Sequence, residues 1–149
     1  RAAILGDLSG TRGRVGRLDG GGLLLQRQIE HAEAALRIVE PIPPLRTLTL
    51  AVLARSLKLA ARGDEALARA REAIEARDTL ASMEEGEALI WLAYLEALEG
   101  DDADRATAQA QGREALERRL GKLSASLREG YLALPEHRAL AEHVGLSTR

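Results

Sequence analysis

The sequence predicts an all-α fold, an α-solenoid in which about six helices stack as helical hairpins. Large apolar residues recur at helical spacing in one stretch and small residues recur in the next: Leu50, Leu53, Ala54 and Leu57, then Ala66, Ala70 and Ala73. The pair Gly63-Asp64 separates the two stretches, and Gly100-Asp101 follows 37 residues later, a period typical of stacked helical hairpins. Aromatic residues make up only 2% of the 149 residues, which favours helices packed through leucine and alanine over β-sheets.

The first 22 residues hold seven of the 14 glycines. Each glycine inside a helix costs about 1 kcal/mol relative to alanine, so a stable helix is not expected here. We therefore divide the chain into a glycine-rich weak helix or strap at residues 1–22 and a helical-repeat domain at residues 23–149. Gly20-Gly21-Gly22 is predicted to form the turn between them.

The first regular helix is predicted at residues 23–39, because apolar side chains share one face there. Three prolines at 41, 43 and 44 prevent its continuation. The next helix is expected from about residue 45 to residue 62, ending at Gly63 in a left-handed conformation. Asp64 then follows as the expected N-cap of a helix at residues 65–78.

The second half of the chain repeats this plan. Ser82 and Glu85 have the spacing of a capping box and predict a helix from there to about residue 99. Gly100 ends it, and another helix is expected at residues 103–120. A longer helix is predicted over residues 123–134, and Pro135 begins a short closing helix that runs through residue 144.

The apolar spacing resembles a tetratricopeptide repeat, with Leu50 at its fourth position and Ala66 at its twentieth. The match covers about 30 residues, and a second copy is degenerate because Arg113 occupies a position where a small residue is expected. The tail, Leu127-Arg128-Glu129-Gly130-Tyr131-Leu132 followed by Pro135-Glu136-His137-Arg138, resembles the end of the repeat region in large bacterial signalling proteins that carry a kinase or an ATPase ahead of the repeats. This resemblance implies a non-enzymatic protein-binding scaffold.

Composition excludes several classes of protein. The chain has no cysteine, so disulfides and thiolate metal sites are excluded. A net charge of −2 gives no general attraction to nucleic acid or to an anionic membrane. No apolar run approaches the length of a membrane span, and the first residues do not form a signal peptide, so we expect a cytoplasmic protein. The first residue is Arg1 rather than methionine, which suggests a piece of a longer array.

No residue pattern predicts an enzyme, a cofactor site or a metal site. The segment from Gly10 to Gly16 is rich in glycine but lacks the lysine of a phosphate-binding P-loop. His31, His137 and His143 are not spaced as a metal-binding pair on one helix. No serine lies in a nucleophile elbow.

The charged residues suggest where a partner binds. Eight acidic residues and no Lys or Arg occur between Glu84 and Asp104. The simpler interpretation is that these acids are solvated and favour the ends of helices. The functional interpretation is an acidic patch, including Glu84, Glu85 and Glu87, that binds a basic peptide or a basic domain.

The repeat resemblance also implies a concave groove, lined by Leu48, Ala51, Arg55, Lys58 and Leu59. Arg55 and Lys58 are similar to the basic half of a clamp for a C-terminal carboxylate. The chain has no asparagine, which such clamps also use, so solvated charges are the alternative interpretation of both residues.

These observations lead to two hypotheses. The first is a protein–protein interaction or regulatory module of a bacterial signalling protein. The second is a structural segment that caps a longer helical-repeat protein or makes it oligomerise. The thin segment before residue 23 offers little area to cover Leu25, Ile29 and Leu36, so we expect the isolated chain to dimerise through that end or to exchange the segment with a second copy.

Overall fold

The structure of the chain is a computed structural model that describes residues 19–80, 83–100 and 102–147. The predictions for the first 18 residues lie outside this range. The described residues form seven helices and no strand: α2 (Asp19–Val39), α3 (Pro43–Leu59), α4 (Gly63–Asp78), α5 (Glu87–Ala97), α6 (Asp102–Gly121), α7 (Ala125–Ala133) and α8 (Pro135–His143). The predicted all-α class is confirmed, with seven helices in this part of the chain where about six were predicted.

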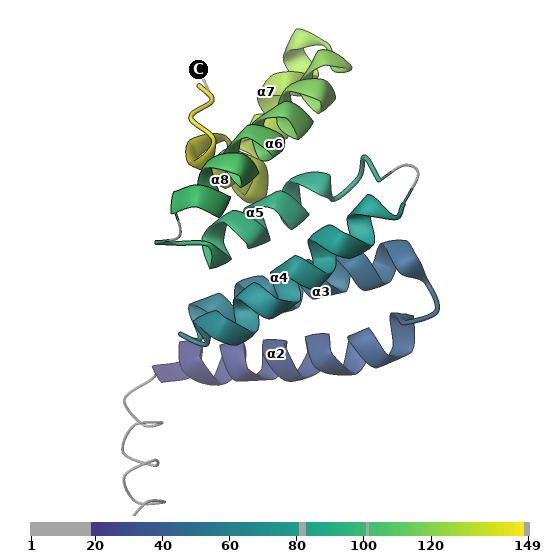
Figure 1. The fold of residues 1–149 in the computed structure, drawn as a ribbon, viewed down its shortest axis with the longest axis vertical. Coiled ribbons are helices and arrows are strands. Elements are labelled where there is room, and N and C mark those ends of the chain that lie inside the picture. Colours follow the sequence, from purple (N-terminus) through teal and green to yellow (C-terminus); the bar gives the residue numbers. More distant parts are fainter. Residues whose placement is uncertain (1–18, 81–82, 101, 148–149) are drawn as a thin grey trace, which may run out of the picture.

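The helices are stacked in chain order, from α2 at one end to the group α6, α7 and α8 at the other (Figure 1). Helix α3 packs against α2, α4 and α5, and α5 packs against α3, α4, α6 and α8. Helix α7 packs against α8 and has no buried residue. Among the described residues, no helix combines the length and the apolar character that crossing a membrane requires.

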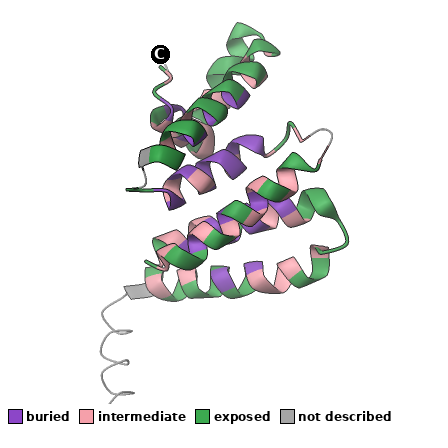
Figure 2. Cartoon of the chain, in the orientation of Figure 1, coloured by how far each residue is buried: buried purple, intermediate pink, exposed green. Residues whose placement is uncertain are grey.

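The core consists of two apolar clusters that meet at α5. One cluster joins residues of α2, α3, α4 and α5, and the other joins residues of α5, α6 and α8. Most of α5 is therefore buried, while α7 is mostly exposed and places only the half-buried Tyr131 and Leu132 against the second cluster (Figure 2). The predicted small-residue stripe, Ala66, Ala70 and Ala73, is fully buried, which lets α4 approach α3 closely.

Several predicted helix ends are wrong because backbone conformation, not residue type alone, decides them. Gly20, Gly21 and Gly22 lie inside α2 instead of forming a turn. Two residues after the end of α3, Ala61 has a φ of 60°, and the Arg62 N–H donates to the Leu57 carbonyl at 2.9 Å. This is the usual hydrogen bond of a left-handed helix end, and the residue in the left-handed conformation is alanine instead of the predicted glycine.

Helix α4 begins at Gly63, so Asp64 lies in the first turn and is not the N-cap. A carboxylate in the first turn still interacts favourably with the partial positive charge of the helix end. Helix α3 begins at Pro43, earlier than predicted, because proline fits the first turn of a helix.

Helix α5 begins at Glu87 and not at Ser82, which lies outside the described residues. Gly86 precedes it with φ 81°, a conformation that side chains rarely adopt, and a Cβ at this position would lie 2.2 Å from Cδ2 of Leu48. The turn and the close packing on α3 therefore both require glycine. The predicted helix over residues 123–134 is the shorter α7, which begins after Ser124.

Candidate functional site

The predicted partner-binding residues Arg55 and Lys58 lie on α3 and form ion pairs with Glu96 of α5 and with Glu99, which follows α5. Nε of Arg55 donates to Oε1 of Glu96 at 2.6 Å, and Nζ of Lys58 lies 3.4 Å from Oε2 of Glu99. The adjoining pocket has a volume of about 210 Å³ and is lined by Lys58, Leu95, Glu96, Glu99, Arg105 and His143. A ligand carboxylate at Arg55 or Lys58 would compete with carboxylates of this chain.

The other residues expected on a concave groove differ in exposure. Ala51 is fully buried, so its predicted place on an open surface is wrong. Leu48 is half-buried and lies against Gly86. Leu59, in contrast, is 74% exposed at the end of α3.

The acidic residues expected to form one patch have separate environments. Glu84 is exposed and pairs with Lys122 and with Arg119, whose Nη1 lies 3.5 Å from its Oε2. The hydrogen bond from Lys122 holds the pKa of Glu84 below its ordinary value. Glu85 is exposed, whereas Glu87 is buried. The three residues therefore do not present a common acidic face.

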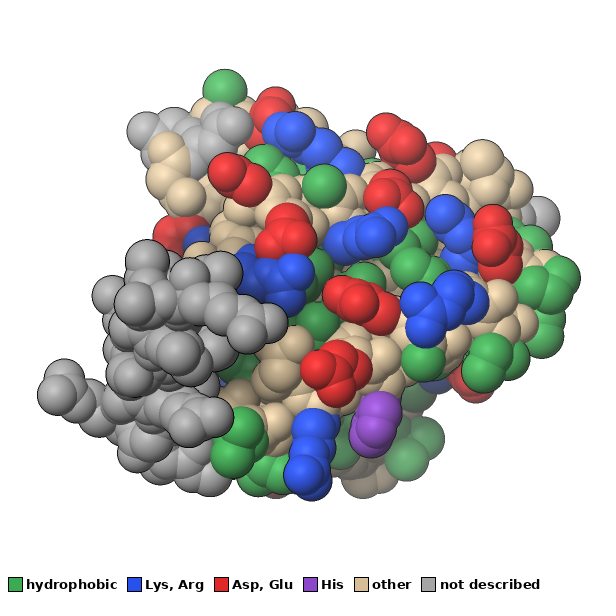
Figure 3. All heavy atoms as spheres, turned by 90° about the horizontal axis from the view of Figure 1, so that it is seen from below, with side chains coloured by type: hydrophobic (Ala, Val, Ile, Leu, Met, Phe, Trp, Pro, Cys, Tyr) green, Lys and Arg blue, Asp and Glu red, His purple; other side chains and the backbone are tan. Residues whose placement is uncertain are grey.

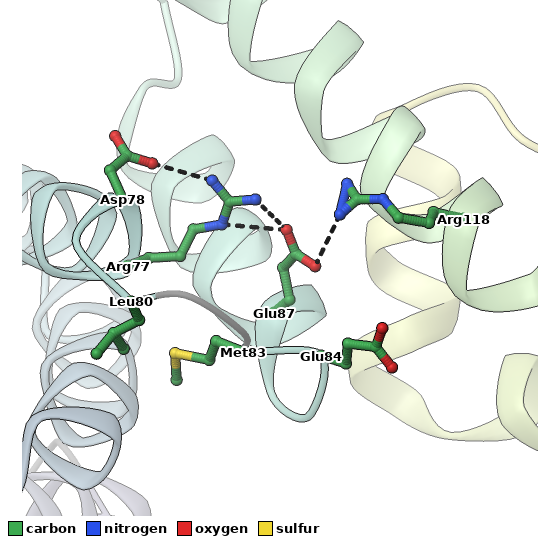
Figure 4. Close-up of a pocket in the computed structure, with 7 residues that line it drawn as sticks. All are labelled: Arg77, Asp78, Leu80, Met83, Glu84, Glu87 and Arg118. Carbon is green, nitrogen blue, oxygen red and sulfur yellow. Dashed lines mark hydrogen bonds and ion pairs between the residues drawn. The ribbon is translucent and has the colours of Figure 1, made fainter.

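Glu87 is the centre of a polar cluster between α4, α5 and α6 (Figure 4). Arg77 donates to its Oε1 through Nε, at 3.0 Å, and through Nη2. Nη1 of Arg118 approaches Oε2 at 3.7 Å from the other side. Nη1 of Arg77 also donates to Asp78 at 2.9 Å. The pocket beside the cluster has a volume of about 260 Å³ and is lined by Arg77, Asp78, Leu80, Met83, Glu84, Glu87 and Arg118.

This cluster is well suited to join helices. Burial lowers the pKa of Arg77, but the hydrogen bond with Glu87 and the charges of Glu87 and Asp78 outweigh that effect and raise it. The guanidinium also lies 5.3 Å from the centre of the Trp91 ring, a cation–π distance. The indole Nε1 of Trp91 is buried and has no hydrogen-bond partner in the described part of the chain. The two arginines thus neutralise the buried carboxylate and fix α4 and α6 to the start of α5.

Sequence reasoning did not identify Arg77 and Arg118 as partners of Glu87. They precede and follow it by 10 and 31 residues, and no helical spacing connects such positions. Only the packing of α4 and α6 around α5 brings them together. One further acid of the predicted patch, Asp104, lies 3.7 Å from Arg71 of α4.

A different surface, between α2 and α3, is mainly apolar. This α2–α3 groove has a volume of about 800 Å³ and is lined by Gly21, Leu24, Leu25, Arg27, Gln28, His31 and Leu59. Leu24 is 67% exposed, although leucine is usually buried. Because Leu59 ends α3 and Leu24 lies in the first half of α2, the two helices run antiparallel along the groove.

The outer side of α2 has a mixed character. Figure 3 views the molecule from this end and shows hydrophobic side chains reaching the surface between basic and acidic ones. Leu23 and Ile38 of α2 are 54% and 76% exposed. The helix therefore buries one face on α3 and leaves several large apolar side chains in solvent.

Comparison with protein-family models, with curated proteins and with solved structures gives no match.

Proposed function

We propose that this chain is a non-enzymatic protein–protein interaction module, and that its binding surface is the α2–α3 groove. The observation that carries the proposal is the exposure of Leu24 and Leu59 on one groove of about 800 Å³. Leaving apolar area in water costs roughly 25 cal/mol per Å², and a partner that covers these side chains recovers that free energy. Exposed apolar grooves of this kind are typical of binding sites for other proteins.

The packing of the helices supports a stack of hairpins of the tetratricopeptide kind. Helices α3 and α4 form a hairpin, α5 packs against both of them, and α6 returns along α5. In such an array each helix packs against the hairpin that precedes it. Helix α2 packs in the same way against α3, on the side that faces the start of the chain. The resemblance of the tail extends the proposal to a regulatory module of a bacterial signalling protein.

The charged residues expected to bind a partner are weaker candidates than the groove. Arg55, Lys58, Glu84 and Glu87 each pair with another residue of this chain. A charged partner must replace an existing ion pair, so its net gain is small. The groove offers apolar contact without that competition.

One observation favours the alternative, a structural or oligomerising segment of a longer repeat protein. Leucines are exposed at the opposite end of the stack too, where Leu127 and Leu134 are 61% and 50% exposed. Sedimentation velocity over a range of concentrations distinguishes the alternatives. An interaction module stays monomeric, whereas a segment that self-associates through its ends sediments faster as the concentration rises.

A peptide titration followed by NMR tests the interaction proposal. The probe is a leucine-rich amphipathic peptide of about 18 residues, long enough to form a helix. We expect amide shifts concentrated in α2 and α3, and at least about tenfold weaker binding when Leu24 and Leu59 are both replaced by serine. Leu127→Ser is the matched control, since it removes an exposed leucine from α7. Shifts confined to other helices, or equal binding by the double variant, refute the proposal.

A further inference from the structure

The ionisable side chains that line the α2–α3 groove are those of one arginine and one histidine. Arg27 and His31 are the ionisable residues among its lining, and no acidic residue of the described part of the chain lines it. Neither makes an ion pair in the described part of the chain. Four other pockets in the described part of the chain differ, since each of them is lined by acidic as well as basic side chains.

The spacing along α2 places these groups beside the apolar residues. Leu24, Arg27 and His31 lie at i, i+3 and i+7, which puts them on one side of the helix over two turns. Two turns span about 10.5 Å at 1.5 Å per residue. Leu59 of α3 forms the other wall of the groove.

Resting on the proposed function, we propose that the occupant of this groove is an amphipathic helix of another protein that carries acidic residues beside its apolar anchors. A helix is the natural occupant because α2 and the end of α3 form the walls, and a helix laid along α2 places residues seven apart opposite Leu24 and His31, which are also seven apart. A carboxylate next to such an anchor accepts hydrogen bonds from the guanidinium of Arg27, which has no competing acid among the described residues that line the groove. The imidazole of His31 supplies a second polar contact one turn further along.

The charges select the partner more than they strengthen binding. An exposed ion pair contributes about 1.5- to 5-fold in affinity, so two acidic residues opposite this groove give a preference of about tenfold over a peptide with lysine at the same places. The apolar anchors supply the larger share of the affinity. Salt lowers the preference, because the rim of the groove is open to solvent.

The experiment compares two amphipathic peptides that have the same leucines and differ only in glutamate or lysine beside them. Fluorescence anisotropy measures the affinity of each at low and at high salt. For the unmodified chain we expect the glutamate peptide to bind about tenfold more tightly at low salt, and the difference to shrink at high salt. Arg27→Glu is expected to reverse the preference. Arg37→Glu is the matched control, because Arg37 is exposed on the same helix but does not line the groove.

The possible outcomes separate this inference from the proposed function. Equal binding of both peptides, unchanged in Arg27→Glu, overturns the inference about charge and leaves the interaction module standing. If neither peptide binds the unmodified chain, both proposals fail. A self-associated chain in which Leu24→Ser restores the monomer also overturns the inference, because the occupant is then a second copy. Circular dichroism verifies that each variant retains its helices.

Discussion

Replacing Gly86 by alanine is expected to lower the free energy of unfolding by about 2–4 kcal/mol, and the structure divides this cost into two parts. The first part is the backbone. Gly86 has φ 81°, and an L-residue in the left-handed region costs about 1–2 kcal/mol. The second part is steric, because the new Cβ would lie 2.2 Å from Cδ2 of Leu48. Overpacking costs about 1–3 kcal/mol, and the lower half of this range applies here because Cδ2 of Leu48 ends a flexible side chain.

A double-mutant cycle separates the two parts. In a Leu48→Ala background the steric cost disappears, so Gly86→Ala is expected to cost only the backbone share of about 1–2 kcal/mol. Gly63→Ala is the control, because a Cβ at Gly63 would have no neighbour within 4 Å and this residue begins α4 with a negative φ. Its effect should stay within about 0.5 kcal/mol.

Urea denaturation followed by the fluorescence of Trp91, the single tryptophan of the chain, measures these differences. Trp91 is buried in α5, directly after the turn that contains Gly86. An equal cost of Gly86→Ala in both backgrounds would refute the contact with Leu48. No measurable cost in either background would refute the left-handed turn before α5.

Four further predictions follow from buried groups. Gly112→Ala in α6 should raise the unfolding free energy by about 0.5–1 kcal/mol, because its Cβ would meet neighbours at an ordinary 3.5 Å; a lower melting temperature contradicts this. Ala70→Leu should lower it by about 1–3 kcal/mol by separating α4 from α3, and an unchanged urea midpoint would argue against that packing. Glu87→Gln should cost about 1–3 kcal/mol because its arginines lose a charged partner, whereas Glu85→Gln, on an exposed neighbour, should leave the melting temperature unchanged. Burial raises the pKa of Tyr131, so stability is complete below pH about 10 and falls as the pH rises through the folded pKa, and an NMR titration giving a pKa of 10 or less would contradict this.

The sequence predicts the helices better than it predicts their ends. Periodicity locates a helix because burial of one face stabilises it over many residues, as Leu50, Leu53 and Leu57 show in α3. A helix end depends on one or two backbone angles, which neighbouring elements can impose. Ala61 takes the left-handed conformation that Gly63 was predicted to take, and Gly86 takes one at a turn where the sequence predicts a helix.

The candidate sites are harder to predict because they depend on partners that are distant in the chain. The sequence alone does not indicate which residues pair with Glu87, and only the packing of three helices shows that Arg77 and Arg118 neutralise its charge. The groove is partly predictable. The repeat resemblance predicts Leu59 on the lining of a concave groove, whereas the exposure of Leu24 depends on how α2 rests on α3.

The Glu87 cluster and the proposed binding groove lie in different parts of the molecule. The Glu87 cluster ties α4, α5 and α6 together, and a ligand there would have to displace ion pairs that the fold already uses. The groove lies on α2 and the end of α3, and its main apolar walls, Leu24 and Leu59, contribute little to the core because most of their surface is in solvent. Residues exposed in this way can change without loss of the fold, so the identity of the partner can be set by α2 while α3 to α6 keep the same core.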